Sequence, residues 1–295
     1  MEKSTTVKPK IIQLPKIVDK RGNLSFVESG LHLPFEIKRA YWIYDVPGGE
    51  TRGGHAFKEQ HEFIVAMSGS FDVVVENREG YKRKFSLNRS YMGLYVPSGS
   101  WRQMKNFSTN SIALVLASTY FDHGDYIRNY DLFKDSSYPT THNSTITRSD
   151  FVSPNIDLFN SSVSDCAIQV FDINHREKGN ITVIENGKDI PFDINRVYYL
   201  YDVPGGEERG GHAHKKLYQL LIAAGGSFDV IMHDGTQEKV VTLNRPYQAL
   251  RIVPGIWREL KNFSSGSCCL VIASHHYNES DYIRDFNDFL KIKNK

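Results

Sequence analysis

The chain contains an internal repeat, and this feature constrains its fold more than any other. Residues 41–75 align with residues 198–232 at an offset of 157 positions, with 20 identities in 35 positions. The match extends to an Asp-Tyr-Ile-Arg sequence that occurs in both copies, beginning at Asp125 and at Asp281. Each copy is about 125 residues long, which is the size of one domain. The period is too long for a solenoid, so the chain is predicted to be a tandem duplication of one domain.

A polar segment separates the two copies. Residues 135–165 are rich in Ser, Thr, Asn and Pro, a composition that is typical of a linker. We therefore predict a first domain over residues 1–134, a linker over residues 135–165 and a second domain over residues 166–295.

Within each copy the pattern predicts β-structure. Short runs rich in Val, Ile, Tyr and Phe, such as residues 198–203 and 228–232, are separated by turn sequences that contain Pro-Gly-Gly or Gly-Gly-Ser. This spacing is typical of a sandwich or barrel of antiparallel strands. Only the end of each copy differs, because apolar residues recur there at helical spacing, near Tyr130 and Phe286. We predict an all-β fold with two tandem jelly-roll barrels, each followed by a short helix.

Charge and cysteine content exclude several classes of protein. The chain has 36 Lys and Arg against 34 Asp and Glu, and the basic residues are scattered, so nucleic acid is not an expected partner. No apolar run approaches the roughly 18–20 residues that span a bilayer, and the first residues lack the apolar segment of a signal peptide. We therefore expect a cytoplasmic protein with no membrane partner. The three cysteines, Cys166, Cys268 and Cys269, cannot build a disulfide framework, and we expect them to pack in the core.

The second copy contains a histidine motif. Gly206 is followed after five residues by His212-Ala213-His214, then after four residues by Gln219 and after six by Gly226. This is the spacing of the first motif of cupins, a class of small jelly-roll barrels. In a strand, residues two apart face the same side. His212 and His214 are therefore expected to enter the barrel interior together, next to two glycines that let a ligand come close.

Two positions depart from the ligand set of metal-binding cupins. That set consists of two such histidines, a Glu and a later His. Here the Glu position holds Gln219 and the later His position holds Arg258. An arginine stays protonated and cannot ligate a cation. We therefore expect a site with no metal and no cofactor, in which two imidazoles exchange protons near neutral pH.

The first copy has only part of this motif. It has His55 and Glu62, and Arg102 again takes the late ligand position, but Phe57 replaces the second histidine. Half of the acid–base pair is missing. We interpret the first copy as a degenerate site kept as a structural partner; the alternative is a site that binds ligand without converting it.

The sequences YYLYDVPGGEERGGHAHKK, GSFDVI, LNRPY, WRELKNFSS, VIAS and DYIR together resemble the dTDP-sugar 3,4-ketoisomerases, the WxcM-like, metal-free cupins of deoxysugar biosynthesis. The similarity covers nearly all of each copy. Members are usually single cupin domains that form homodimers, so the resemblance implies a pseudo-dimer within one chain, with a further homodimer as an open alternative. It also implies that dTDP-4-keto-6-deoxy-D-glucose is converted to a dTDP-3-keto-6-deoxyhexose.

The resemblance implies roles for residues of the second copy. His212 and His214 are expected to move protons through an enediol intermediate, although the sequence does not say which abstracts and which delivers. Tyr198 or Tyr199 could polarise the sugar oxygens, and packing in the barrel is the alternative for either. The further residues expected to bind substrate are Arg209, Arg258, Gln219 and Gly211. The degenerate site of the first copy is expected to consist of His55, Arg52, Glu62 and Arg102.

Arg209 is the main candidate to face the diphosphate or the enolate, because a guanidinium offers two parallel donors to anionic oxygens. A structural role is its alternative. Three other functions stay open for the whole chain: a metal-dependent cupin enzyme, a sugar-nucleotide 3,5-epimerase and a non-catalytic module that binds nucleotide sugars. The intact histidine pair in only one copy favours catalysis, because a binding module has no need for this difference.

Overall fold

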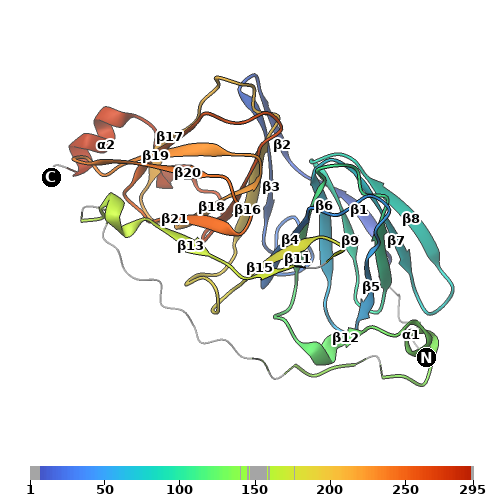
Figure 1. The fold of residues 1–295 in the computed structure, drawn as a ribbon. Helices are drawn as coiled ribbons and strands as arrows, with labels where there is room; N and C mark the ends of the chain where they lie inside the picture. Colours follow the sequence, from blue (N-terminus) through green and yellow to red (C-terminus); the bar gives the residue numbers. More distant parts are fainter. Residues whose placement is uncertain are drawn as a thin grey trace. The chain divides into compact units, whose positions relative to one another are not determined.

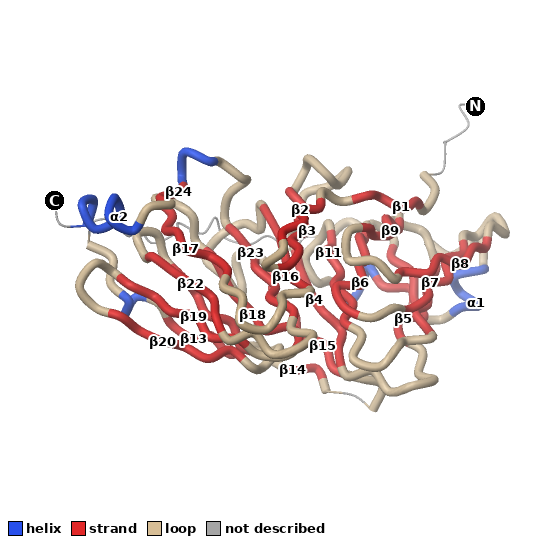
Figure 2. The backbone as a smooth tube through the Cα atoms, turned by 90° about the horizontal axis from the view of Figure 1, so that it is seen from above, coloured by secondary structure: helices blue, strands red, loops and turns tan. Residues whose placement is uncertain are grey.

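The computed structural model describes residues 7–139, 141–144, 146, 158, 160–175 and 177–293. Much of the predicted linker, residues 135–165, therefore lies outside the described residues. The predicted all-β class is confirmed: strands make up most of the secondary structure of the described residues, and the α-helices among them are the short α1 (Tyr130–Lys134) and α2 (Phe286–Lys293) (Figure 2).

The described chain divides into two compact units, and neither unit is a continuous stretch of sequence. Unit 1 consists of residues 1–14, 35–148 and 174–185, and unit 2 of residues 15–34, 149–173 and 186–295. Each unit therefore contains a segment of the other repeat. The predicted bounds, residues 1–134 and 166–295, describe the two sequence repeats and stay a prediction. The compact units have other bounds, because each includes a segment from the other repeat.

Unit 1 contains two antiparallel sheets. The larger has the order β1 (Lys10–Gln13), β9 (Met92–Val96), β6 (Glu62–Ser68), β11 (Ile112–Ala117), β4 (Arg39–Tyr44), β15 (Asn180–Glu185) and β14 (Ile173–Asn174). The smaller has the order β12 (Tyr126–Ile127), β5 (Arg52–Phe57), β10 (Trp101–Lys105), β7 (Phe71–Glu76) and β8 (Lys82–Leu87). Alternate apolar side chains of the two sheets, among them Ile64, Val73, Met104 and Val115, form one buried cluster. The sheets therefore face each other across a core, as in a jelly roll.

Unit 2 repeats this arrangement. Its larger sheet has the order β13 (Ala167–Val170), β21 (Gln248–Ile252), β18 (Gln219–Gly225), β23 (Cys268–Ala273), β16 (Arg196–Tyr201), β3 (Gly22–Glu28) and β2 (Lys16–Asp19). Its smaller sheet has the order β24 (Tyr282–Ile283), β17 (Arg209–His214), β22 (Trp257–Lys261), β19 (Phe228–His233) and β20 (Glu238–Leu243). The strand orders match those of unit 1 position by position, so the duplication of the sequence is a duplication of the fold.

The two repeats exchange equivalent strands. In unit 2, β3 from the first repeat pairs with β16 (Figure 1). The register places Glu28 opposite Arg196 at one end and Asn23 opposite Tyr201 at the other. In unit 1, β15 from the second repeat pairs with β4 from Arg39 opposite Glu185 onward. Side chains reinforce the first pairing, because the Ser25 and Tyr201 hydroxyl groups lie 3.1 Å apart in buried surroundings. Each sheet is thus completed by a strand that belongs to the other repeat in sequence.

A short helix covers the outer face of each smaller sheet, as predicted. In unit 2, Phe289 of α2 packs in a buried cluster with Ala213, Trp257 and Ile283. In unit 1, Phe133 of α1 packs with the equivalent residues. Ala213 therefore points out of the barrel toward the helix, and the side chains on either side of it, those of His212 and His214, take the opposite face.

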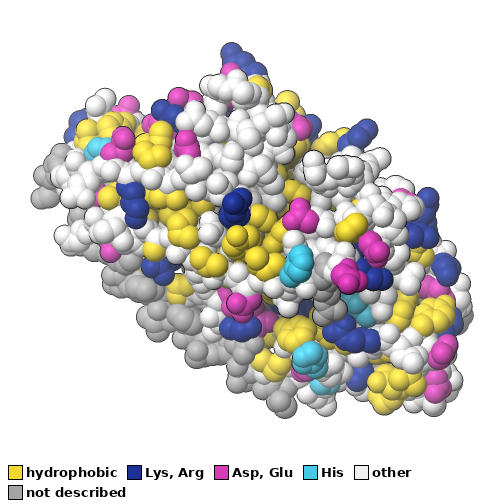
Figure 3. All heavy atoms as spheres, viewed as in Figure 1, with side chains coloured by type: hydrophobic (Ala, Val, Ile, Leu, Met, Phe, Trp, Pro, Cys, Tyr) yellow, Lys and Arg dark blue, Asp and Glu magenta, His cyan; other side chains and the backbone are white. Residues whose placement is uncertain are grey.

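The surface agrees with the balanced charge of the sequence. On the face shown in Figure 3, Lys and Arg side chains lie among Asp and Glu side chains, with no large region of one sign. The cysteines Cys166, Cys268 and Cys269 are free and buried, as expected from the sequence. In the part of the chain that the structure describes, neither of the helices is long and apolar enough to cross a membrane.

Candidate active site

The approach to the histidines depends on two glycines of β17. Gly210 and Gly211 have φ angles of +86° and +68°, which are conformations that favour glycine, and the strand register shifts between Gly210 and His212. A Cβ atom at Gly210 would lie 2.9 Å from the carbonyl oxygen of Arg258. Gly210 therefore lets β17 approach β22 closely, and the bulge directs His212 toward the interior.

The two histidine rings lie next to each other. Their ring centroids are 4.9 Å apart with an interplanar angle of 87°, and the ring of Tyr282 lies 4.9 Å from His212 and 4.3 Å from His214. The strand alternation anticipated from the sequence thus places both imidazoles on one face. The buried Nε2 atom of each has no hydrogen-bond partner among the described residues. Two buried ring nitrogens without a protein partner are polar atoms that a bound ligand would satisfy.

A carboxylate orients one of the histidines. Oδ2 of Asp281 lies 2.9 Å from Nδ1 of His214, and Oδ1 of Asp281 accepts a hydrogen bond of 2.8 Å from the backbone amide of Lys216. Burial alone would raise the pKa of Asp281, but the hydrogen bond and the charge of His214 lower it below its ordinary value. Asp281 is therefore ionised near neutral pH and acts as an acceptor toward the ring.

Both histidines are neutral near pH 7. Burial lowers the pKa of His214 to about 4, against the opposing effect of the hydrogen bond that His214 donates to Asp281. Burial, followed by the positive charge of Arg258, holds the pKa of His212 well below its ordinary value. A neutral His214 that donates Nδ1–H to Asp281 carries its lone pair on Nε2. That atom is a base facing the interior.

A buried arginine lies on the strand beside the histidines. Arg258 pairs with His212 across β22 and β17, and its Nη1 donates a hydrogen bond of 3.3 Å to the carbonyl oxygen of His212. The Nε atom of Arg258 is buried without a partner among the described residues. Gln219, on the opposite sheet, donates a hydrogen bond of 2.8 Å from Nε2 to the hydroxyl group of Tyr198, and its Oε1 atom is buried without such a partner.

Two further residues predicted for the site, Tyr199 and Arg209, make other contacts. Tyr199 is fully buried and its ring packs on that of Tyr201, 5.9 Å away, so the alternation of β16 puts Tyr198 rather than Tyr199 on the face of the histidines. Arg209, at the start of β17, donates a hydrogen bond of 3.2 Å to the carbonyl oxygen of Gly22 and lies 3.7 Å from the carboxylate of Asp19. Arg209 thus contacts the exchanged segment, which the sequence did not indicate.

The equivalent site of unit 1 is closed by an ion pair. Arg102 donates hydrogen bonds of 2.7 Å from Nε and 2.9 Å from Nη2 to the two carboxylate oxygens of Glu62, and one of 3.0 Å to the hydroxyl group of Tyr41. Both members of the pair are almost fully buried. The ring of Phe57 packs 4.8 Å from His55, where His214 stands in unit 2. The Nε2 atom of His55 is still unpartnered among the described residues, but its acid–base partner is absent.

The first repeat's Arg52 is buried at the start of β5, in the position equivalent to Arg209. Among the described residues no group of three or more His, Cys, Asp or Glu side chains could hold a metal ion. The donor set at the histidines contains Gln219 and Arg258, and neither offers an anionic ligand.

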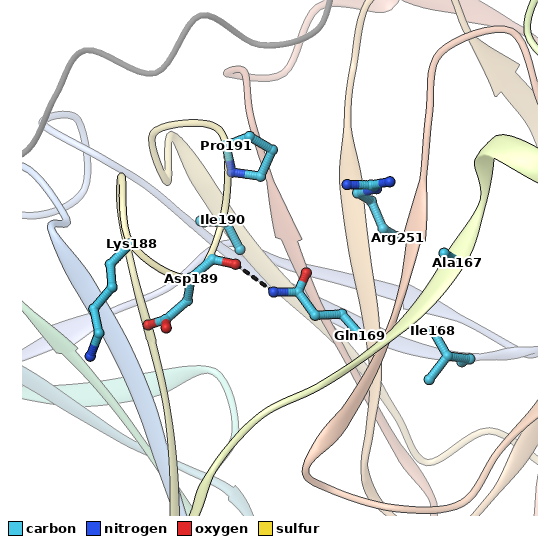
Figure 4. Close-up of a pocket in the computed structure, with 8 residues that line it drawn as sticks. All are labelled: Ala167, Ile168, Gln169, Lys188, Asp189, Ile190, Pro191 and Arg251. Carbon is cyan, nitrogen blue, oxygen red and sulfur yellow. Dashed lines mark hydrogen bonds between the residues drawn. The ribbon is translucent and has the colours of Figure 1, made fainter.

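A cavity of about 370 Å³ lies elsewhere in unit 2. It is lined by residues of β13, β21 and the loop at 188–191, including Gln169 and Arg251 (Figure 4). Gln169 donates a hydrogen bond of 2.5 Å from Nε2 to the carbonyl oxygen of Asp189 across it. The Lys188 side chain extends away from the Arg251 guanidinium (Figure 4). Its lining contains none of the site residues predicted from the sequence.

Three residues that adjoin the histidines had no role predicted from the sequence. They are Asp281, Tyr282 and Arg196, whose Nη2 lies 3.4 Å from the hydroxyl group of Tyr282. The available signal was the Asp-Tyr-Ile-Arg sequence shared by both copies, which places a carboxylate directly before β24 and an aromatic ring at its first residue.

Two facing antiparallel sheets with two histidines, a buried arginine and a buried amide between them define an enzyme-like cupin barrel. The family model described as FdtA: WxcM-like, C-terminal matches the chain twice, over residues 7–138 and 164–294. The chain belongs to this family, and it is an isomerase with two tandem cupin domains.

Three similar proteins each cover less than half of this chain. The TDP-4-oxo-6-deoxy-alpha-D-glucose-3,4-oxoisomerase of Aneurinibacillus thermoaerophilus is 46% identical over 114 residues, which are 39% of this chain and 82% of the relative. A 3,4-ketoisomerase structure from Helicobacter canadensis is 45% identical, with a TM-score of 0.44, covering 44% of this chain and 98% of that one. The WlaRB TDP-quinovose 3,4-ketoisomerase structure from Campylobacter jejuni is 42% identical, with a TM-score of 0.42, covering 43% and 98%.

Proposed function

We propose that the chain is a sugar-nucleotide 3,4-ketoisomerase that converts dTDP-4-keto-6-deoxy-D-glucose to a dTDP-3-keto-6-deoxyhexose in the interior of unit 2. The observation that carries this proposal is the pair of neutral imidazoles whose buried Nε2 atoms face the interior without partners. The substrate is proposed by analogy with a relative, the TDP-4-oxo-6-deoxy-alpha-D-glucose-3,4-oxoisomerase, which is 46% identical to this chain over most of its own length.

The reaction needs only proton transfers. A base removes the proton from C3, the electron pair forms a C3–C4 double bond, and the C4 oxygen becomes an oxyanion. After that oxygen is protonated and the C3 hydroxyl group loses its proton, the electrons return to C4, which takes up a proton, and the ketone stands at C3. No hydride carrier enters this balance.

The described side chains fit these steps. Nε2 of His214, with Nδ1–H held by Asp281, takes the proton from C3; the imidazolium then exchanges with solvent and returns a proton to C4. His212, 4.9 Å away between ring centroids, exchanges a proton with the oxygens. The guanidinium of Arg258 offers its unpartnered Nε–H to the developing oxyanion, an interaction that is strong in a buried site. Tyr198, held by Gln219, supplies a hydroxyl group near the same oxygens.

We propose that unit 1 does not convert substrate. It has Phe57 in place of the base, and its arginine is already neutralised by Glu62. We further propose that the enzyme acts in the cytoplasm, since its three free, buried cysteines suit a reducing compartment. The pairing of the two repeats as a pseudo-dimer within one chain stays a prediction.

The proposed activity is tested by incubating the purified chain with dTDP-4-keto-6-deoxy-D-glucose in D₂O and following the sugar by NMR. A ketoisomerase gives a 3-keto product with deuterium at C4, and reduction or amination of the product reveals the configuration at C4. Deuterium at C5 would identify a 3,5-epimerase instead. An unchanged substrate would contradict any isomerase activity on this sugar, and stoichiometric metal in active protein, measured by elemental analysis, would point to a metal-dependent enzyme.

A further inference from the structure

The two units differ in the charge that faces the interior arginine. Arg102 of unit 1 and Arg258 of unit 2 occupy equivalent positions, each paired across the smaller sheet with the first histidine of its motif. Both guanidinium groups are buried, with side chains about 2–3% exposed. Glu62 faces the first arginine, whereas the position equivalent to Glu62 in unit 2 is occupied by the neutral Gln219.

The backbone places these two residues identically. Glu62 is opposite Ala117 and Val96 in the larger sheet of unit 1, and Gln219 is opposite Ala273 and Ile252 at the same places in unit 2. A tyrosine hydroxyl group contacts each of them, from Tyr41 in unit 1 and from Tyr198 in unit 2. The difference between the units is therefore one of side-chain charge rather than of backbone position.

This difference changes how many polar atoms are left for a ligand. In unit 1, Nε of Arg102 and both carboxylate oxygens of Glu62 take part in hydrogen bonds. In unit 2, Nε of Arg258 and Oε1 of Gln219 are both buried without partners among the described residues. A buried guanidinium without a counter-charge is costly to the free protein, and it binds an anion strongly for the same reason.

We propose that Gln219 is the residue that makes unit 2 competent: its neutral amide leaves Arg258 free to stabilise the oxyanion of the sugar, whereas a carboxylate at this position closes the site by pairing with the arginine, as Glu62 does with Arg102. The inference rests on the proposed function, because that oxyanion arises in the proposed reaction. Gln219 is thus a positioning residue that acts through Arg258.

The test compares Gln219→Glu with Gln219→Met, which has a similar length and no charge. The carboxylate is expected to lower kcat about 100-fold, the size of effect seen when one oxyanion donor is removed, with little change in KM. The methionine variant is expected to lose less than tenfold. Folding of the glutamate variant is expected, because unit 1 accommodates the same Glu–Arg–Tyr arrangement, and thermal unfolding checks it.

A second measurement does not depend on turnover. The charges and titratable groups that affect His212 are Arg258, His214 and Arg284, and those that affect His214 are Asp281, Arg258 and Arg196. The negative charge introduced by Gln219→Glu is expected to raise the pKa of His212, measured by NMR of the ring. The reciprocal Glu62→Gln is expected to lower the pKa of His55.

These outcomes separate the two proposals. Equal losses of kcat in the two Gln219 variants, or a glutamate variant with more than a tenth of the original kcat, would overturn the role of Gln219 while leaving the proposed function intact. If the unmodified chain converts no keto sugar, the proposed function fails. In that case the pKa of His212 in the Gln219→Glu variant still tests whether a carboxylate at this position pairs with Arg258. An unchanged pKa of His212 would overturn that ion pair.

Discussion

Oδ2 of Asp281 lies 2.9 Å from Nδ1 of His214, whereas the equivalent Asp125 of unit 1 makes hydrogen bonds to backbone amides and, among the described residues, to no histidine. The carboxylate of Asp125 accepts hydrogen bonds from the backbone amides of Glu59, at 2.7 Å, and Gln60, at 3.2 Å. Both aspartates therefore hold the turn that follows the motif strand, and only Asp281 also orients a ring. The two aspartates therefore share a structural function, to which Asp281 adds its proposed function in catalysis.

The change Asp281→Asn is expected to lower kcat roughly 100-fold, within the usual range for general acid–base catalysis. The amide keeps an acceptor for the Lys216 backbone but no longer stabilises the charged imidazolium or fixes the proton on Nδ1. Steady-state kinetics with the keto sugar measure the effect. The matched control is Asp125→Asn, which should leave kcat near its original value; an unchanged kcat in the Asp281 variant would show that the carboxylate is only structural.

The change His214→Phe copies the sequence of the first repeat into the second. It should abolish turnover, because Nε2 of His214 is the proposed base, while affinity for TDP stays within a few-fold, measured by calorimetry. Phe57 already packs in the equivalent position beside His55, so the fold should tolerate the ring. His55→Phe is the control and should have little effect on rate. A comparable loss in that variant would mean that unit 1 is also catalytic.

The low pKa of His214 also predicts how stability depends on pH. Burial lowers the pKa to about 4 in the folded protein, whereas the unfolded chain binds the proton near pH 6.5. Between these values the unfolded state holds more protons, so this histidine makes the protein less stable as the pH falls, by up to about 3 kcal/mol. The His214→Phe variant should therefore gain stability relative to the original chain from pH 7 to pH 4.5, measured by urea unfolding. A constant difference would contradict the buried, neutral histidine.

Much of this architecture follows from local sequence. The repeat predicts two similar domains, and strand alternation through His212-Ala213-His214 predicts that the histidines share a face while Ala213 takes the other. Arg258 and Gln219 could be located because their distances along the chain match a known motif. These features depend on spacing, which a sequence states directly.

The strand exchange could not be predicted in this way. The segments at 23–28 and 180–185 are equivalent copies, and each pairs in the same register with the strand of the other repeat. Two copies with the same pattern can pair within or between repeats, so only the path of the connecting chain distinguishes these pairings. The contact between His214 and Asp281 was missed for a related reason, since 67 residues separate them and no periodicity links them.

The ion pair that closes unit 1 should contribute to stability rather than to catalysis. Replacing Glu62 with Gln leaves the buried Arg102 without a counter-charge, which is expected to lower the free energy of unfolding by about 3–5 kcal/mol. The pKa of Glu62 is lowered to about 2, against the effect of burial, mainly by the charge and hydrogen bonds of Arg102. The stabilisation is therefore complete above pH 4.5, the ordinary pKa of the group, and disappears as the pH falls toward 2.

Denaturant unfolding at pH 7 and pH 3 should show a smaller effect of the Glu62→Gln substitution at the lower pH. Glu50→Gln, which removes an exposed carboxylate 3.4 Å from Lys178, is the control and should change stability by less than about 1 kcal/mol. An effect of Glu62→Gln as small as that of the control would show that Arg102 does not depend on the carboxylate.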